Sequence, residues 1–317
     1  MAHGEAFPEQ TAAGPGLGRV VVAGGTGLVG RALVKTLVAR GAEVAVLTRR
    51  PGTAVLPPGA KALGWEHPAL ALEGAGAVFN LAGEGIADRR WTSSRKRALL
   101  QSRVAPTEDL VAALAACTRR PSVLVNASAI GYYGARPDDT PVSEASPAGA
   151  GFLPELCQAW EAAALPAVEL GVRVVLPRIG VVLAEQGGAL PKMARPVRLF
   201  AGVCLGQGRQ GLSWIHLRDL VNLLVETAMN PAWEGPVNAT APEPVSHAVF
   251  MALLAKRLHR PLLPIPGFLT HAALALALGE LGRELLLHGA FVYPGKAEAL
   301  EFPFRFPTPE AALEDLL

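Results

Sequence analysis

Residues 19–30 read RVVVAGGTGLVG, a short β-branched run followed by glycines at every third position, Gly24, Gly27 and Gly30. The apolar run predicts a buried strand, and the apolar spacing that follows predicts a helix over residues 30–40. Glycines between a strand and a helix permit a tight turn and close backbone approach to a phosphate, which the helix N-terminus attracts. An ordinary strand-to-helix turn is the alternative, but a strand and a helix on either side favour a dinucleotide site.

The composition is that of a globular protein. Of the 317 residues, half are hydrophobic and 18% are charged, and 29 basic against 27 acidic residues leave a net charge of +2. A chain so near neutrality is not expected to bind nucleic acid or a membrane surface. The cysteines Cys117, Cys157 and Cys204 form no close pair, which disfavours a disulfide framework or a metal site and favours the cytoplasm. We expect neither a signal peptide nor a membrane anchor.

Short β-branched runs alternate with helical patterns through the first half of the chain. This alternation predicts an α/β fold, a Rossmann-type doubly wound parallel sheet. The strands are expected at residues 20–23, 43–47, 77–82, 123–127 and 172–176. The helices are expected at residues 30–40, 93–117 and 152–164.

The alternation of strand and helix patterns ends after about residue 183. Beyond it, glycine- and proline-rich loops surround helices predicted at residues 217–229 and 246–258. A flexible N-terminal extension is expected ahead of the first strand. We therefore divide the chain into that extension (1–18), a Rossmann domain (19–183, completed by part of 184–245) and a small C-terminal substrate or cap domain (246–317).

The second predicted strand ends with Leu47-Thr48-Arg49-Arg50. NAD-specific sites usually carry an acidic residue here, which binds the ribose hydroxyls. A guanidinium group instead matches the geometry of a phosphate with paired donors. Arg49, helped by Arg50, therefore predicts NADP(H), which carries a 2′-phosphate; a solvated arginine pair at a strand end is the alternative.

Several further segments resemble a known family. NLAG (80–83) and SAIGYYG (128–134) resemble the extended or atypical short-chain dehydrogenases/reductases. The resemblance narrows to a nucleotide-sugar-epimerase-like subgroup that ends in its own small domain of unknown function, and it covers residues 19–317. The segments that carry it are EG (84–85), RW (90–91), SR (102–103), WE (160–161), RIGVVL (178–183), SWIHLRD (213–219), GE (279–280), ELLL (284–287), VYPGK (292–296) and FPFRFP (302–307).

The resemblance implies an epimerase-like oxidoreductase that binds NADP(H) and acts on a small-molecule substrate, such as a sugar nucleotide or a carbonyl compound. The sequence does not determine the oligomeric state, for which a homodimer is one candidate. For Glu84, which is among the cofactor-binding residues given next, a solvated glutamate in a loop is the alternative. The cofactor-binding residues that the resemblance implies are Gly24, Thr26, Gly27, Leu28, Val29, Gly30, Thr48, Arg49, Leu81, Ala82, Gly83, Glu84, Arg103 and Val182.

One part of the superfamily pattern is missing. Typical members pair a Ser or Thr with Tyr-x-x-x-Lys, in which the phenol transfers a proton and the lysine lowers its pKa. Counted back from Trp160, the helix at 152–164 offers Leu153 and Cys157 in those places. Neither suits that chemistry, because leucine has no exchangeable proton and a lone helical cysteine usually packs. A non-catalytic NADP(H)-binding regulatory protein, for example one related to cell division, is therefore the alternative function.

The remaining candidates for proton transfer lie beyond two strands. Ser128 follows the fifth strand, although a shift of register would place Ala129 there instead. Tyr132 and Tyr133 come next, either as proton donors or as rings packed against the cap. His216 precedes the helix at 217–229, where Asp219 is available to orient it; a structural, hydrogen-bonded histidine is the alternative.

Overall fold

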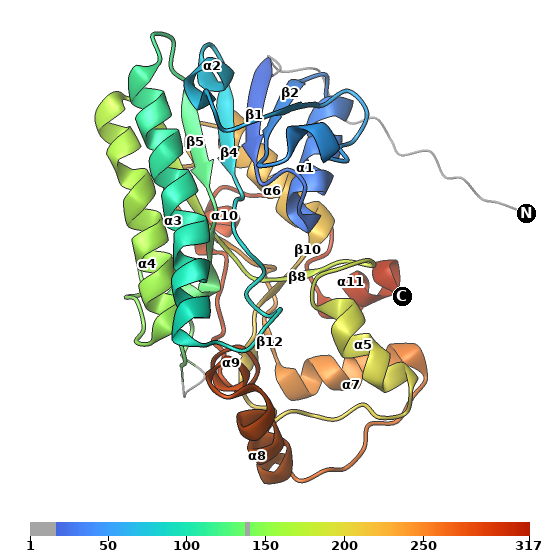
Figure 1. Ribbon diagram of the computed structural model, residues 1–317. Coiled ribbons are helices and arrows are strands. Elements are labelled where there is room, and N and C mark those ends of the chain that lie inside the picture. The colour runs from blue at the N-terminus through green and yellow to red at the C-terminus, as the bar shows by residue number, and fades with distance from the viewer. Residues whose placement is uncertain (1–16, 137–139) are drawn as a thin grey trace, which may run out of the picture.

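A parallel sheet forms the centre of the molecule (Figure 1). The computed structural model describes residues 17–136 and 140–317, so most of the predicted N-terminal extension lies outside the described residues. The strand order is β11-β7-β5-β4-β1-β2-β3, and β6 continues the sheet beside β7. The strands are β1 Arg19–Ala23, β2 Glu43–Leu47, β3 Lys61–Leu63, β4 Ala77–Asn80, β5 Val123–Asn126, β6 Ser128–Ala129, β7 Arg173–Ile179 and β11 Gly235–Ala239.

Helices cover both faces of this sheet, which confirms the predicted doubly wound fold. Strand β1 shows why, because Val20 and Val22 enter one apolar core while Val21 and Ala23 enter the other. Side chains of a strand alternate between faces, so a strand buried on both sides is apolar throughout. The first core includes α1 (Leu28–Ala39) and α6 (Leu217–Met229). The second includes α2 (Pro68–Leu72), α3 (Ser93–Ala116) and the end of α4 (Phe152–Ala164).

Two predicted strands end earlier than expected, each at a buried asparagine. The Asn80 Oδ1 atom accepts the N–H of Ala82 at 3.2 Å, and the Asn80 side chain donates to Asn126 Oδ1 at 2.6 Å. It also donates to the Thr107 hydroxyl at 2.8 Å. A side chain that binds its neighbouring backbone competes with the sheet for that N–H group. The strand predicted at 77–82 therefore stops at Asn80. The one predicted at 123–127 stops at Asn126, whose side chain donates to the carbonyl of Ala127.

The second half of the chain adds short elements at the carboxyl edge of the sheet. Strand β8 (Val181–Leu183) pairs with β10 (Trp214–His216), and β9 (Gly211–Leu212) pairs with β12 (Val245–Ser246). A third core forms around Trp214, Phe250 and Leu254. No helix in the described part of the chain is both long and apolar enough to cross a bilayer. The helices here are α5 Leu190–Arg198, α7 His247–Leu258, α8 Gly267–Leu278, α9 Glu280–Gly282, α10 Gly295–Ala299 and α11 Pro309–Leu316.

The C-terminal segment returns to the edge of the sheet. Strand β11 pairs only with β7 within the sheet, and residues 292–296 cover its other side, where the Lys296 ammonium group donates to the carbonyls of Glu234 and Pro236. The Asn238 amide donates to the carbonyl of Tyr293 at 2.9 Å, and the Thr240 hydroxyl donates to the carbonyl of Val292 at 3.1 Å. Phe302 then packs into the core that α1 and α6 share.

Candidate functional site

The glycine turn joins β1 to α1 at the carboxyl edge of the sheet. Gly24 has φ +79°, and a Cβ there would lie 2.5 Å from the carbonyl carbon of Leu81. A Cβ on Gly30 would overlap the carbonyl oxygen of Gly24. No side chain among the described residues caps α1 at Gly27, so its first N–H groups have no intrahelical or capping partner. The turn therefore fits a diphosphate, which needs close backbone approach and free amides.

Three separate segments meet at this turn. The strand order reverses between β1 and β4, and parallel sheets bind ligands in the crevice at such a point. The loop after β4 lies against Gly24 through Leu81. The loop after β8 also reaches the turn, because a Cβ on Gly188 would lie 3.0 Å from the Val182 carbonyl and 3.2 Å from Leu28 Cδ2. The structure thus brings Val182, Leu81 and the turn together.

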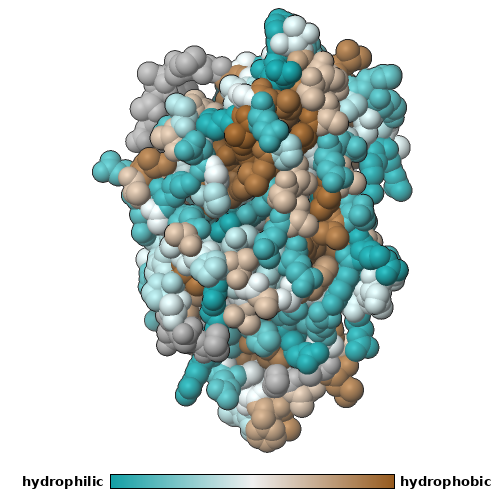
Figure 2. Space-filling model, turned by 90° about the vertical axis from the view of Figure 1, so that its left-hand side faces the viewer, coloured by the Kyte–Doolittle hydropathy of each residue, from teal (hydrophilic) through white to brown (hydrophobic). Residues whose placement is uncertain are grey.

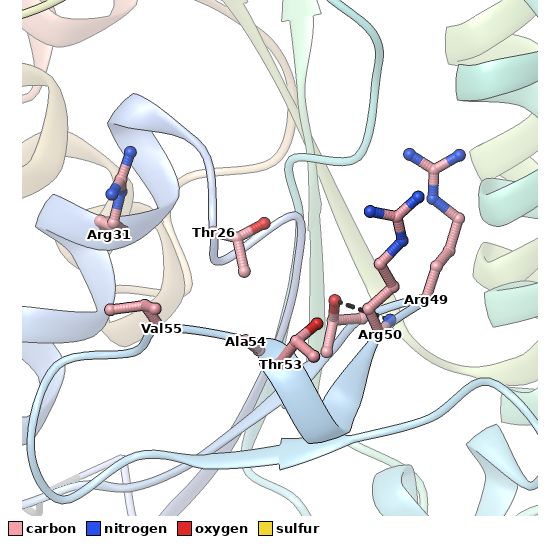
Figure 3. A pocket seen from close by; sticks show the side chains of 8 residues that line it. Thr26, Arg31, Arg49, Arg50, Thr53, Ala54 and Val55 are labelled. Carbon is pink, nitrogen blue, oxygen red and sulfur yellow. Dashed lines mark hydrogen bonds between the residues drawn. The ribbon is translucent and has the colours of Figure 1, made fainter.

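A pocket of about 580 Å³ opens beside the turn (Figure 3). Arg49 and Arg50 extend in the same direction from the end of β2, while Arg31 extends from α1 on the other side. All three side chains are exposed, and within residues 17–136 and 140–317 none forms an ion pair. No acidic residue lines the pocket, so it is cationic. Its lining is Thr26, Arg31, Thr48, Arg49, Arg50, Thr53, Ala54 and Val55.

Helix α3 holds the loop that continues from β4. The Ser102 hydroxyl accepts the N–H of Glu84 at 3.1 Å, and the Arg103 guanidinium donates to the Glu84 carbonyl at 2.9 Å. A Cβ on Gly83 would lie 3.1 Å from Arg103 Cζ. The Glu84 carboxylate pairs with Arg95 rather than standing free in solvent. Arg103 therefore supports the loop that carries Gly83 and Glu84.

A buried polar network lies behind the loop after β5. The Ser128 hydroxyl donates to Glu161 Oε1 at 2.7 Å. Arg178 of β7 binds both carboxylate oxygens of Glu161, with Nε at 2.8 Å and Nη2 at 2.9 Å. Burial alone would lower the pKa of Arg178, but its hydrogen bonds to Glu161 and Tyr133 raise it well above the ordinary value. Arg178 therefore stays charged in the interior.

The two tyrosines of the 3-10 helix η2 (Ile130–Tyr133) have different surroundings. Tyr133 is fully buried, accepts from Arg178 Nη1 at 2.9 Å and donates to Asn238 Oδ1 at 2.6 Å. Burial raises its pKa. Tyr132 is half-buried and its ring centroid lies 3.4 Å from Arg178 Cζ. No described residue binds the Tyr132 hydroxyl, so this phenol is the one free to meet a ligand.

Leu153 and Cys157 of α4 face the same segment. A Cβ on Gly131 would lie 3.3 Å from Leu153 Cβ and 3.7 Å from Cys157 Sγ. Cys157 is buried, and its thiol lies 3.6 Å from the carbonyl oxygen of Ala129. Burial raises the pKa of Cys157 to about 12. The thiol therefore stays protonated at neutral pH and acts as a packed apolar group.

His216 is buried at the start of α6. Its Nδ1 accepts the N–H of Arg218 at 3.0 Å, and its Nε2 lies 3.2 Å from Asp315 Oδ2. The imidazole stacks on Phe306 with ring centroids 3.8 Å apart. Burial lowers the pKa of His216 to about 4. The ring is therefore neutral at physiological pH and caps a helix.

Asp219 does not orient His216 as the sequence suggested. Its two carboxylate oxygens accept the backbone N–H groups of Arg305 and Phe306, at 3.1 and 2.8 Å. His216 and Asp219 thus both tie α6 to the C-terminal segment. These contacts favour the structural alternative for His216 over a role in proton transfer.

We expect the burial of His216 to make stability depend on pH. Above pH 6.5 the imidazole is neutral in both the folded and the unfolded chain. As the pH falls toward 4, the unfolded chain binds a proton that the folded chain does not, so stability falls by on the order of 3 kcal/mol. Urea unfolding between pH 7 and 4 measures this loss.

The His216→Asn variant supplies a helix-capping oxygen in place of the imidazole Nδ1 and should show a shallower pH dependence. Some dependence will remain, because burial also lowers the pKa of His247 to about 4. His67→Asn, at an exposed position, is the control. If the free energy of unfolding of His216→Asn fell with pH as steeply as that of the wild type, groups other than His216 would cause the pH dependence.

Sequence reasoning missed four residues of this region. Arg31 follows the last glycine of the turn, where a cation in the first helical turn is unfavourable without an anion. Glu161 and Arg178 were noticed only as parts of motifs. A buried ion pair is indicated when two apolar segments each contain one charged residue and the two charges are opposite. Here the segments are AWEAA and VVLPRIG. Asn238 carried no such signal.

Comparisons with known proteins cover nearly the whole chain. Residues 20–238 match the NAD dependent epimerase/dehydratase family, and residues 269–316 match a domain of unknown function (DUF1731). An epimerase family protein of Mycobacterium bovis is 40% identical over 299 residues, which cover 93% of this chain and 96% of that protein. The chloroplastic homologue of epimerase family protein SDR39U1 from Arabidopsis thaliana is 40% identical over 311 residues, covering 94% and 86%.

A solved structure agrees with both matches. The crystal structure of human epimerase family protein SDR39U1 (isoform 2) with NADPH has a TM-score of 0.84 and 32% identity to this chain, and covers 94% of this chain and 98% of that one. The sequence resemblance to epimerase-like short-chain dehydrogenases/reductases with their own C-terminal domain is thereby confirmed. The chain belongs to the NAD dependent epimerase/dehydratase family and carries the DUF1731 domain at its C-terminus.

Proposed function

We propose that the chain binds NADP(H) at the glycine turn and uses it in an epimerase-like oxidoreductase reaction on a small molecule. The observation that carries the cofactor choice is the pocket after β2, which holds Arg49 and Arg50 and no acidic residue. The human relative, crystallised with NADPH, supports the same choice. Bound NADP(H) would supply or accept a hydride.

Each part of the site has a role toward this cofactor. The amides at the start of α1 would bind the diphosphate, and Arg49 with Arg50 would bind the 2′-phosphate. The loops at Leu81 and Val182 flank the turn, and Arg103 keeps the first of these loops in place. We further propose that residues 246–317 form the cap over the substrate.

Tyr132 is the residue that we propose for proton transfer. Its hydroxyl has no partner among the described residues, whereas Ser128 and Tyr133 are engaged in the network around Glu161 and Arg178. That network fixes the Arg178 guanidinium against the Tyr132 ring. Ser128 and Tyr133 would then act by positioning, and the charge of Arg178 would stand near the phenol in place of the missing lysine.

A second candidate function is a regulatory protein that binds NADP(H) without turning it over. It is favoured by Leu153 and Cys157, which face Gly131 where typical members place a tyrosine and a lysine. The protonated Cys157 thiol offers no acid near neutral pH.

Titration of the protein with NADPH and NADH, followed by nicotinamide absorbance with carbonyl compounds and sugar nucleotides, separates the two functions. Turnover that Tyr132→Phe removes while NADPH affinity is retained supports the enzyme. Tight NADPH binding without turnover on any substrate supports the regulatory protein. Failure to bind either nucleotide overturns both.

Reversing the charge of Arg49 should weaken NADPH selectively. In Arg49→Glu a carboxylate replaces the guanidinium beside the 2′-phosphate, so we expect NADPH affinity to fall at least about tenfold and NADH affinity to rise or stay. Isothermal titration calorimetry with both nucleotides measures the ratio. Lys35→Glu, on the exposed face of α1 and outside the pocket lining, is the matched control. Equal losses of affinity for NADPH and NADH would show that Arg49 does not bind the 2′-phosphate.

We also propose a homodimer formed through α3 and α4. Apolar side chains gather on the face that Figure 2 shows, over these two helices. A groove of about 730 Å³ runs between them, and its lining is mainly apolar, with two glutamates: Val104, Glu108, Val111, Ala112, Ala115, Ala159, Ala162, Ala163, Pro166, Glu169 and Leu170. Light scattering should give twice the chain mass, and a groove variant, Ala112→Glu, should give the monomer. Ala116→Glu, exposed on the same helix but outside the groove, should remain dimeric.

A further inference from the structure

Arg31 stands one residue past the last glycine of the turn and lines the pocket from α1, on the side opposite Arg49 (Figure 3). The chain after β2 returns to this helix, because a Cβ on Gly59 would lie 2.8 Å from Val38 Cγ1. This return places Val55, which is 80% exposed, in the same pocket as Arg31. The pocket therefore has one wall from α1 and one from the segment after β2.

The charges in this pocket lack counterions. Arg31, Arg49 and Arg50 form no ion pair within the described residues, whereas Arg95 and Arg178 each bind a glutamate. Three cations around one pocket repel one another, and an anion between them would relieve that repulsion. A phosphate monoester, with close to two negative charges at neutral pH, is the anion best suited to several guanidinium groups.

Building on the proposed function, we infer that Arg31 is a specificity-determining residue for NADP(H). Its guanidinium binds the 2′-phosphate from the side opposite Arg49, and Val55 provides an exposed apolar surface beside the adenosine. The diphosphate is the other anionic part of the cofactor. It meets the backbone amides of the glycine turn, whereas Arg31 shares its pocket with Thr48 and Arg49. Arg31 and Arg49 therefore act on the same phosphate.

The probes for this inference are 2′,5′-ADP and 5′-ADP, which differ by the 2′-phosphate alone and require no turnover. Calorimetry on Arg31→Gln should show about a tenfold loss of affinity for 2′,5′-ADP and NADPH, and no change for 5′-ADP and NADH. Lys35→Gln removes the same charge one helical turn further along α1 and should leave all four affinities unchanged. Unfolding curves on both variants check that the fold is intact, as expected for exposed side chains.

Four results would overturn the inference. A loss in Arg31→Gln that is equal for 2′,5′-ADP and 5′-ADP would place Arg31 away from the 2′-phosphate. A loss of the same size in Lys35→Gln would show that the effect of Arg31→Gln comes from the loss of one positive charge on α1, and not from a contact with the 2′-phosphate. Arg31→Gln with wild-type affinities, while Arg49→Glu loses NADPH, would refute the role of Arg31 and leave the proposed function standing. A wild-type protein that binds no nucleotide would refute both.

Discussion

Replacing Glu161 with alanine is expected to lower the free energy of unfolding by about 3–5 kcal/mol. The variant leaves the Arg178 guanidinium buried, without the two carboxylate oxygens that it binds at 2.8 and 2.9 Å. It also leaves the Ser128 hydroxyl without its acceptor. Urea unfolding at pH 7 measures the loss.

Two further variants test whether the lost charge pairing is the cause. Removing both charges with Glu161→Leu and Arg178→Met should recover most of the stability, because no buried charge then stays unpaired. Glu43→Ala breaks the exposed pair with Lys61, whose side chains are 60% and 73% exposed, and should cost less than about 1 kcal/mol. A double variant as unstable as Glu161→Ala would indicate lost packing as the cause.

Replacing Gly30 with alanine is expected to lower NADPH affinity about a hundredfold or more. The added Cβ would overlap the carbonyl oxygen of Gly24, and backbone atoms cannot move aside as a side chain can. The turn must therefore open, which displaces the amides at the start of α1 from the diphosphate. We also expect a loss of stability of about 1–3 kcal/mol, typical of overpacking in a buried position. Calorimetry with NADPH and urea unfolding measure the two effects.

Gly52→Ala is the matched control for this substitution. Gly52 lies in the 3-10 helix η1 (Pro51–Thr53) near the same pocket, and a Cβ there would meet nothing within 4 Å. This variant should bind NADPH as the wild type does. If Gly30→Ala also bound NADPH with wild-type affinity, the cofactor would not depend on the closed form of the turn.

The sequence predicted the sheet best where a local residue pattern is compatible with only one kind of secondary structure. The run at residues 19–23 and the apolar residues Leu33, Val34 and Leu37 specify a strand and a helix by their own periodicity. The ends of β4 and β5 were less predictable, because they lie where the side chains of Asn80 and Asn126 bind the backbone that follows, and a third contact, between these two distant residues, orients both side chains. The two-residue strands β9 and β12 likewise exist only through their pairing with each other.

The site divides in the same way. The glycine turn and Arg49 were predictable, because each follows a strand directly and local geometry decides its place. The ion pair between Glu161 and Arg178 depends on the packing of α4 against β7, which residue spacing does not report. The different surroundings of Tyr132 and Tyr133 also come from tertiary contacts alone, since the two residues adjoin in sequence. Which phenol is free to react was therefore beyond sequence reasoning.

The return of the C-terminal segment to β11 affects how the chain is made. A nascent chain that has emerged from the ribosome up to residue 260 already contains every strand of the sheet. It still lacks Lys296, whose ammonium group donates to the backbone carbonyls of Glu234 and Pro236 along this edge. An open sheet edge is a template for intermolecular pairing and aggregation. Synthesis of residues 261–317 thus closes the edge, and a protein truncated before Lys296 would carry it exposed for its whole lifetime.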